Sequence, residues 1–268
     1  MARDGSQPTD RIVGGRTPLY YCPPGTLYVV STPIGHPDDI TLRALATLRH
    51  VDVIASEDPL MTQALLAHHG ITATVTSYGP LNRHEKVLLL LHRLMQGQDV
   101  ALVSDNGTPV IYDPGSLFVA AAHQAGIPVK AIPGPTSMTA AAAISGFSGD
   151  AIIFEGHLPS TSHRLGQYLS RLRKERSTLV FYVDPGALTG LLKALAQILP
   201  TRQIAIAMNL TMSEETFSRG RPGKLLDQVG PVSKDSAVTV VIEGYRAGSQ
   251  TRKMRGRMSR VTRLHGGR

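Results

Sequence analysis

Short apolar runs alternate with amphipathic stretches over most of the chain, and turns rich in glycine, proline and aspartate separate them. The apolar runs have the length of buried strands, while the amphipathic stretches repeat their apolar residues every three or four positions, as helices do. Such alternation is typical of sheets covered by helices. The pattern therefore predicts an α/β protein. Strands are predicted over residues 27–31, 51–55, 100–103, 129–132, 152–156, 178–182, 203–208 and 238–242.

Capping residues mark where several of the predicted helices begin and end. Asp39 is expected to cap the first helix. Asp58 and Pro59 supply an N-cap and a favoured first residue for the second helix, which Gly70 ends. The stretch 220–223 predicts a glycine-rich turn. Further helices are predicted over residues 82–96, 116–125, 138–145, 163–176 and 188–199.

Three of the predicted strands end in loops made of glycine, proline and hydroxyl residues. The loops cover residues 32–35, 104–115 and 132–137. Because ligands bind outside the carboxyl ends of parallel strands, these loops predict one shared cleft. Gly107 permits close approach of the backbone to a ligand, and Asp105 supplies a carboxylate.

The same loops carry a family resemblance. The resemblance is carried by five segments, LYVVSTPIGHPDDITLRAL (27–45), SEDP (56–59), VALVSDNGTPVIYDPG (100–115), AIPGPTS (131–137) and FEGHLP (154–159). They resemble the tetrapyrrole-methylase-type S-adenosylmethionine (SAM) methyltransferases, in order and with similar spacing from residue 26 to about 245. Within that superfamily they look most like the rRNA small-subunit methyltransferase I group, which methylates a cytidine ribose 2′-oxygen.

The resemblance implies two α/β domains with a SAM-binding cleft between them. It also implies a homodimer that acts on 16S rRNA in the 30S subunit. We expect a flexible leader over 1–25, an N-terminal α/β domain over 26–148, a C-terminal α/β domain over 149–245 and a basic tail over 246–268, with the hinge near 146–150.

By the same resemblance, the cofactor site draws on both domains. Pro33 and Gly35 would line one wall, and Thr136 and Ser137 would lie under the cofactor. The methionine and ribose would be held by Asp105, Gly107, Thr108 and Ile111. The adenine would sit near Phe154, near Met208 or Leu210, and near Val238 and Thr239. For Met208 and Leu210, simple strand core is an equally good interpretation.

A ribose hydroxyl must lose its proton during attack, so a base is expected near the cleft. Glu57 and Asp58 are the carboxylates of the first domain best placed for that role, with Asp105 as a further candidate if the cofactor does not use it. His68 and His69 are expected to be surface residues, because no third metal ligand stands at a useful spacing in the sequence. No metal site is predicted.

The net charge of +8 is confined to one end of the chain. From Arg246 onward there are eight Lys/Arg and no Asp/Glu, so residues 1–245 hold 20 basic and 20 acidic residues. Such a tail can neutralise phosphates without reading sequence. It is either disordered or a basic amphipathic helix on RNA or an anionic membrane.

Other classes of protein are disfavoured by what the sequence lacks. The dinucleotide fingerprint GxGxxG and the P-loop are absent, and the single cysteine, Cys22, forms no disulfide framework. No apolar run approaches the roughly 20 residues of a membrane span, and no secretory signal is present, which predicts a cytoplasmic enzyme.

The chain departs from the rRNA group where that group carries basic residues. Residues 183–187 read Val-Asp-Pro-Gly-Ala in place of Glu-Ser-Pro-His-Arg, residues 208–212 read Met-Asn-Leu-Thr-Met in place of Arg-Glu-Leu-Thr-Lys, Pro59-Leu60 replace Thr-Arg, and Asn106 replaces an alanine. Three hypotheses remain: an rRNA ribose 2′-O-methyltransferase, a SAM methyltransferase of the same fold for a small molecule or tetrapyrrole, and a non-catalytic SAM- or RNA-binding protein.

Overall fold

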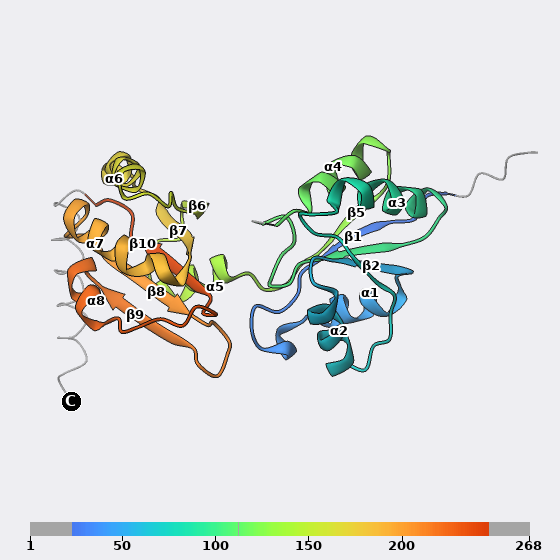
Figure 1. The fold of residues 1–268 in the computed structure, drawn as a ribbon, viewed down its shortest axis with the longest axis horizontal. Helices are drawn as coiled ribbons and strands as arrows, with labels where there is room; N and C mark the ends of the chain where they lie inside the picture. Colours follow the sequence, from blue (N-terminus) through green and yellow to red (C-terminus); the bar gives the residue numbers. More distant parts are fainter. Residues whose placement is uncertain (1–22, 112, 247–268) are drawn as a thin grey trace, which may run out of the picture.

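The computed structural model describes residues 23–111 and 113–246, which form two lobes, each built on a five-stranded sheet (Figure 1). The first sheet is parallel throughout and has the order β3-β2-β4-β1-β5. Its strands are β1 (Leu27–Val30), β2 (Val53–Ser56), β3 (Val75–Ser77), β4 (Val100–Val103) and β5 (Val129–Ile132). Most of the predicted leader and nearly all of the predicted basic tail lie outside the described residues.

Helices cover both faces of the first sheet. On one face, α1 (Leu42–His50) and α2 (Pro59–His68) bury a cluster that includes Leu48, Ile54 and Leu66. On the other face lie α3 (Arg83–Met95) and α4 (Ser116–Gln124), packed through residues such as Leu90 and Phe118 (Figure 1). The predicted α/β pattern is confirmed for this lobe.

The predicted start of α2 is confirmed, and the predicted start of α1 is wrong. The Asp58 carboxylate accepts hydrogen bonds from the Leu60 and Met61 N–H groups at 2.9 and 3.3 Å. Asp39, the expected cap of α1, lies instead in the short 3₁₀ helix Pro37–Asp39. Thr41 caps α1, because its extended backbone lets its hydroxyl accept the Ala44 N–H at 3.1 Å.

The second sheet is mixed and has the order β6-β7-β10-β8-β9. Only β6 and β7 are parallel in it, while the other neighbours run antiparallel. Its helices α6, α7 and α8 cover one face and bury a core of mainly leucine, isoleucine and valine. The bounds are β6 (Ile152–His157), α6 (Ser162–Arg171), β7 (Thr178–Val183), α7 (Leu188–Ile198), β8 (Ile204–Met208), β9 (Thr216–Gly220), α8 (Pro222–Gln228) and β10 (Val238–Ile242).

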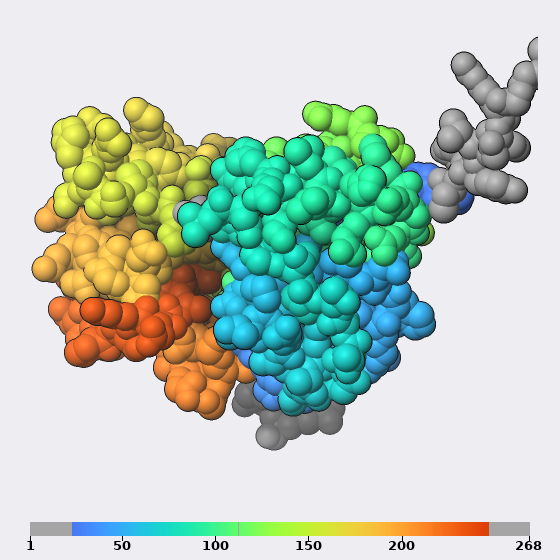
Figure 2. Space-filling view, turned by 45° about the vertical axis from the view of Figure 1, so that its right-hand side comes forward, coloured from blue at the N-terminus to red at the C-terminus, as the bar shows by residue number. Residues whose placement is uncertain are grey.

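The other face of the second sheet is covered by α5 (Ser137–Ser145), which precedes that sheet in the chain. Ala141 of this helix packs in one cluster with Val180, Ala205 and Val241, and Ile34 of the first lobe joins the same cluster. Figure 1 draws α5 beside the second sheet, and Figure 2 shows the two lobes in contact. The domain limits at 148 and 149 stay a prediction, and the packing of α5 crosses them.

A buried arginine ties the end of α6 to the end of β10. Arg202 is 7% exposed and donates hydrogen bonds to three carbonyls of the 172–175 turn at 3.1 to 3.2 Å. It also donates to the carbonyl of Glu243, and its guanidinium lies 5.8 Å from the centre of the Tyr245 ring. One side chain therefore fixes two distant backbone segments just before residue 246.

Within the described ranges, no helix is both long enough and apolar enough to cross a membrane.

Candidate functional site

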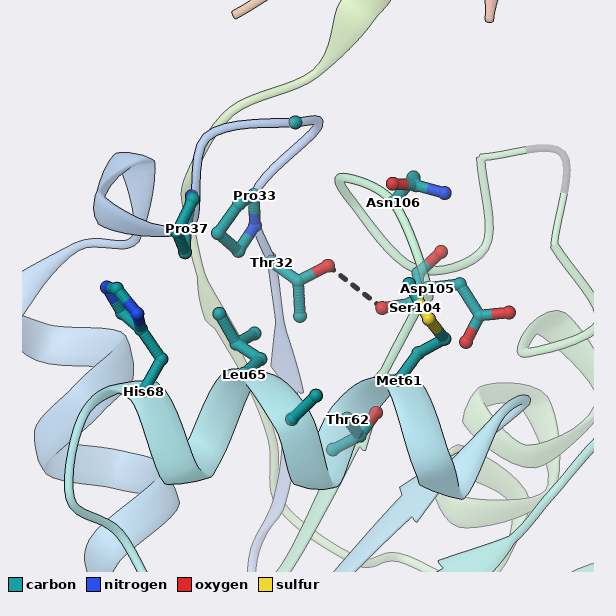
Figure 3. A pocket seen from close by; sticks show the side chains of 12 residues that line it. Thr32, Pro33, Pro37, Met61, Thr62, Leu65, His68, Ser104, Asp105 and Asn106 are labelled. Carbon is teal, nitrogen blue, oxygen red and sulfur yellow. Dashed lines mark hydrogen bonds between the residues drawn. The ribbon is translucent and has the colours of Figure 1, made fainter. Parts of the chain in front are cut away.

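A first pocket of about 330 Å³ lies at the carboxyl edge of the first sheet, between the loop after β1, one face of α2 and the loop after β4 (Figure 3). Pro33 and Gly35 line it from the first loop, and Asp105 and Asn106 from the last. The hydroxyl of Thr32 donates to the Ser104 carbonyl at 2.8 Å and joins the two loops.

The backbone of Gly107 joins the loop after β4 to the loop after β1 by two hydrogen bonds. It donates its N–H to the Pro33 carbonyl at 3.2 Å and accepts the Thr32 N–H at 2.9 Å. Its φ is +90°, and a Cβ here would stand 3.2 Å from Cγ2 of Ile34. Only glycine adopts this conformation without strain, which explains the residue type in the motif.

The loop after β4 also stores backbone strain. Val110 has a φ of 75°, which is rare for a β-branched residue. The Asp113 carboxylate accepts the Gly115 N–H at 2.9 Å and a longer bond from the Val110 N–H at 3.4 Å. Such strain persists where surrounding bonds fix the loop, and it concentrates at functional sites.

A second pocket of about 260 Å³ lies between the lobes and shares Asn106 with the first. Ile34 and Leu210 give it apolar walls, and Ser137 and Thr239 give it hydroxyls. Asn106 is the residue that stands where the rRNA group carries an alanine. The two pockets therefore meet at one substituted position.

The structure brings seven of the predicted cofactor residues to these two pockets. Pro33, Gly35 and Asp105 line the first pocket, and Ser137, Leu210, Val238 and Thr239 line the second.

The other predicted cofactor residues lie around the pockets or apart from them. The Thr108 hydroxyl bonds the Ser31 hydroxyl at 2.9 Å, next to Gly107, while Ile111 is 41% exposed. Phe154 packs its ring against Tyr182, which lines the second pocket, with centres 4.8 Å apart. Met208 packs with the core under α6, α7 and α8, on the opposite face from Leu210.

Carboxylates gather beside the first pocket. Oδ1 of Asp105 accepts the Asp58 N–H at 3.0 Å, and the Asp58 side chain caps α2. Burial raises the pKa of Glu57, and the nearby charges of Asp105 and Asp113 raise that pKa further. Burial likewise raises the pKa of Asp105, although the Asp58 N–H opposes that rise. The carboxyl groups of Glu57 and Asp105 therefore hold protons more readily than exposed ones do.

Glu57→Gln is expected to stabilise the protein at neutral pH by less than about 1 kcal/mol, a small gain because solvent screens a partly exposed group. The folded-state pKa of Glu57 lies above the reference value of 4.5, so its ionisation costs stability as pH rises through that window. The gain should therefore vanish well below pH 4.5, where Glu57 is protonated in both the folded and the unfolded state. Urea unfolding across pH measures it. Glu85→Gln, an exposed change in the first turn of α3, should show no gain, and an equal gain would contradict the prediction.

Two loops touch across the lobes at the mouth of the site. The His36 N–H donates to the Thr211 hydroxyl at 2.8 Å. A Cβ on Gly35 would lie 2.5 Å from the Leu210 carbonyl oxygen. Asn209 and Thr211 have positive φ values of 52° and 67°, so this loop is also strained. The contact sets how closely the lobes approach.

Sequence reasoning missed several residues that the fold brings to the site. His157, Tyr182 and Asp184 line the second pocket, and Nδ1 of His157 lies 3.5 Å from Oδ1 of Asp184. His157 belongs to FEGHLP, one of the segments that carry the family resemblance, so that segment could have indicated it. Asp38 stands beside His68 and His69, so the third ligand absent from the local sequence is supplied by another loop.

The polar and apolar groups that line the two pockets suit SAM. The side-chain oxygen of Thr136 is buried and has no hydrogen-bond partner among the described residues, and it stands next in the chain to Ser137 of the second pocket. The apolar walls of the second pocket suit an adenine, while the acidic end at Asp105 suits an ammonium group.

Comparison with known proteins agrees with this geometry. The model of the Tetrapyrrole (Corrin/Porphyrin) Methylases family matches residues 26–226. Ribosomal RNA small subunit methyltransferase I of Thermotoga maritima is 38% identical over 220 residues, 82% of this chain and 99% of that protein. The protein of that name from Escherichia coli O157:H7 is 38% identical over 226 residues, 83% of this chain and 79% of that protein.

Solved structures share the fold. A cobalt precorrin-4 methyltransferase has a TM-score of 0.62 at 20% identity, covering 81% of this chain and 94% of that one. Uroporphyrin-III C-methyl transferase from Thermus thermophilus, complexed with S-adenyl homocysteine, has a TM-score of 0.57 at 19% identity, covering 82% and 97%. The predicted fold is confirmed, and the predicted methyltransferase class and SAM cofactor are confirmed at the level of the family. The chain belongs to the tetrapyrrole (corrin/porphyrin) methylases.

Proposed function

We propose that this chain transfers the methyl group of SAM to the ribose 2′-hydroxyl of a cytidine in 16S rRNA. The observation that carries the proposal is the pair of pockets that meet at Asn106, in a chain matched over 99% of a relative named for small-subunit rRNA methylation. The first pocket offers the Asp105 carboxylate to an ammonium group, and the second offers the apolar walls of Ile34 and Leu210 to an adenine.

The proposed roles follow from position. Leu210, Val238 and Thr239 hold the adenosine, and Asp105 holds the methionine ammonium. SAM supplies an electrophilic methyl group on a sulfonium. Alignment and exclusion of water are then the main tasks of the protein. Glu57 accepts the proton of the hydroxyl, because it stands near Asp105 and directly precedes Asp58, whose N–H binds Asp105. Asp58 acts as a positioning residue through its N–H on Asp105.

The direct test incubates the full chain with methyl-labelled SAM and 30S subunits from a strain that lacks this methylation. Label recovered in 2′-O-methylcytidine after nuclease digestion is the expected result. No label in any nucleoside, with SAM binding verified by calorimetry, would overturn the assignment to rRNA.

Two substitutions separate binding from turnover. Asp105→Ala is expected to weaken SAM binding about tenfold or more, because a charged hydrogen bond contributes about 1.5–3 kcal/mol. Glu57→Gln should keep the SAM affinity and lower turnover about 100-fold or more. Calorimetry and the labelling assay measure the two effects, with Asp39→Ala, an exposed carboxylate, as the control. Unchanged SAM affinity in Asp105→Ala would return Asp105 to the candidate bases.

Removing the basic tail tests how the protein reaches RNA. Truncation after Tyr245 deletes eight Lys/Arg. The affinity for 30S subunits should fall and its dependence on salt should become shallower, because fewer counterions are released from the RNA. Filter binding across salt concentrations measures the slope. An unchanged slope would show that the tail does not contact phosphates.

One observation favours a second candidate, a different methyl acceptor. Gly186 and Ala187, where the rRNA group carries His-Arg, line a cavity of about 530 Å³ that adjoins the second pocket through His157 and Asp184. Small residues there leave room for a compact substrate. Methyl transfer to a small molecule, with none to 30S subunits, would favour this candidate. The homodimer and the cytoplasmic location stay predictions.

A further inference from the structure

We propose that Asp38, His68 and His69 form a binding site for a divalent transition-metal ion, Zn²⁺ above all, at the outer end of the first pocket. The site lies beyond the methyl-transfer chemistry and does not depend on the proposed function.

The three side chains converge from two elements. One ring nitrogen of each histidine and one carboxylate oxygen of Asp38 lie within 4.8 Å of one another. Nε2 of His68 already lies 2.9 Å from Oδ1 of Asp38. Within residues 23–111 and 113–246, this is the one group of three such ligands. Zn–N and Zn–O bonds are about 2.0–2.2 Å long, so donor atoms up to 4.8 Å apart must move closer by side-chain rotation as the ion replaces the hydrogen bond between His68 and Asp38.

The ligand set indicates the kind of ion. Two imidazoles and one carboxylate are borderline ligands that suit Zn²⁺ better than Ca²⁺ or Mg²⁺, which prefer oxygen. Three protein ligands leave one tetrahedral position open to water or to an anionic oxygen. His68 and Asp38 are partly exposed, so an ion can reach the site from solvent.

Neighbouring bonds hold the ligands in place. His36 accepts the Asp38 N–H on its Nδ1 at 3.2 Å and fixes the turn that presents the carboxylate. Nε2 of His69 lies 3.0 Å from the Pro37 carbonyl, and that contact must be exchanged when His69 binds the ion through this nitrogen. The cost is one hydrogen bond of an exposed loop.

The position of the site indicates what a bound ion would do. Pro37 and His68 both line the first pocket, one from the loop wall and the other from the end of α2 (Figure 3). An ion bound by Asp38 and His68 joins these two walls. It would fix the 33–39 loop, which also carries the cross-lobe bond from His36.

Calorimetric titration of ZnCl₂ into the full chain, free of any affinity tag and stripped with EDTA, tests the site. Wild type should bind one equivalent at the site. His68→Ala and Asp38→Asn should weaken that binding about 100-fold, since losing a ligand costs at least as much as losing the partner that orients it. His92→Ala, an exposed histidine on α3, is the matched control and should bind as wild type does.

The thermal unfolding midpoint gives a second measurement. Zinc should raise the midpoint of wild type and of His92→Ala, and leave that of His68→Ala unchanged. The proposal is overturned if wild type shows no saturable binding, or if both ligand variants bind zinc as tightly as wild type. Because the readout is zinc binding, either result is independent of whether 30S subunits are methylated.

Discussion

Gly35→Ala is expected to weaken SAM binding about tenfold or more, equivalent to about 1.4 kcal/mol. A Cβ at this position would lie 2.5 Å from the Leu210 carbonyl oxygen and 2.7 Å from the Thr211 hydroxyl. These atoms belong to a strained loop that is held to its own sheet, so the two loops have to separate. Because Gly35 lines the first pocket and Leu210 the second, separation opens both walls of the site.

Calorimetry with SAM measures the loss, and Gly149→Ala is the matched control because a Cβ there meets nothing within 4 Å. The free energy of unfolding should change much less than the binding affinity, since the clash lies between lobes rather than in either core. Equal SAM affinity in Gly35→Ala and wild type would mean that the contact does not set the geometry of the site.

Arg202→Met should lower the free energy of unfolding by about 3 kcal/mol. The substitution keeps part of the packing and removes every donor of the guanidinium. The Glu243 carbonyl and three carbonyls of the 172–175 turn then lose a charged partner in a partly buried place. Some of these carbonyls accept a second hydrogen bond, which keeps the cost below the sum of independent losses.

Urea unfolding measures this loss. Arg171→Met, an exposed change at the end of α6, should stay within about 0.5 kcal/mol of wild type. A similar small change in Arg202→Met would indicate that water replaces the lost donors. SAM binding should persist in the folded fraction, because Arg202 lines neither pocket and donates its hydrogen bonds within the second lobe.

The sequence predicts every buried strand and the edge strands β5 and β6, but it misses the edge strands β3 and β9. β4 and β5 have the predicted bounds, since β-branched runs between turn residues leave little choice. β3 and β9 are edge strands with half-exposed, partly polar residues, so no apolar alternation marks them. The stretch 220–223, predicted as a turn, holds the end of β9 and the start of α8 at Pro222, because proline is favoured in a first helical turn.

The residues of the site also fall into those that the sequence predicts and those that it misses. Loops that follow buried strands, such as the one with Asp105 and Gly107, are visible in the sequence because glycine and proline mark them. The pairs His68–Asp38 and His157–Asp184 join residues about 30 positions apart in the chain, and only the fold brings them together. The alternatives at Met208 and Leu210 depend on which face of the sheet each side chain takes, and strand bounds alone leave that open.

The position of α5 has a consequence for how the protein is made. This helix leaves the ribosome before any strand of the second sheet. The face it covers is completed only by β10, which is the last strand in the chain and the central strand of that sheet. Its apolar residues therefore have no finished partner during most of synthesis, and such non-local contacts form late. A separate C-terminal piece that starts after α5 would therefore leave the face with Val180, Ala205 and Val241 uncovered. We therefore expect the packing of α5 on this sheet to form late in folding, and the same step brings Ser137 to the second pocket.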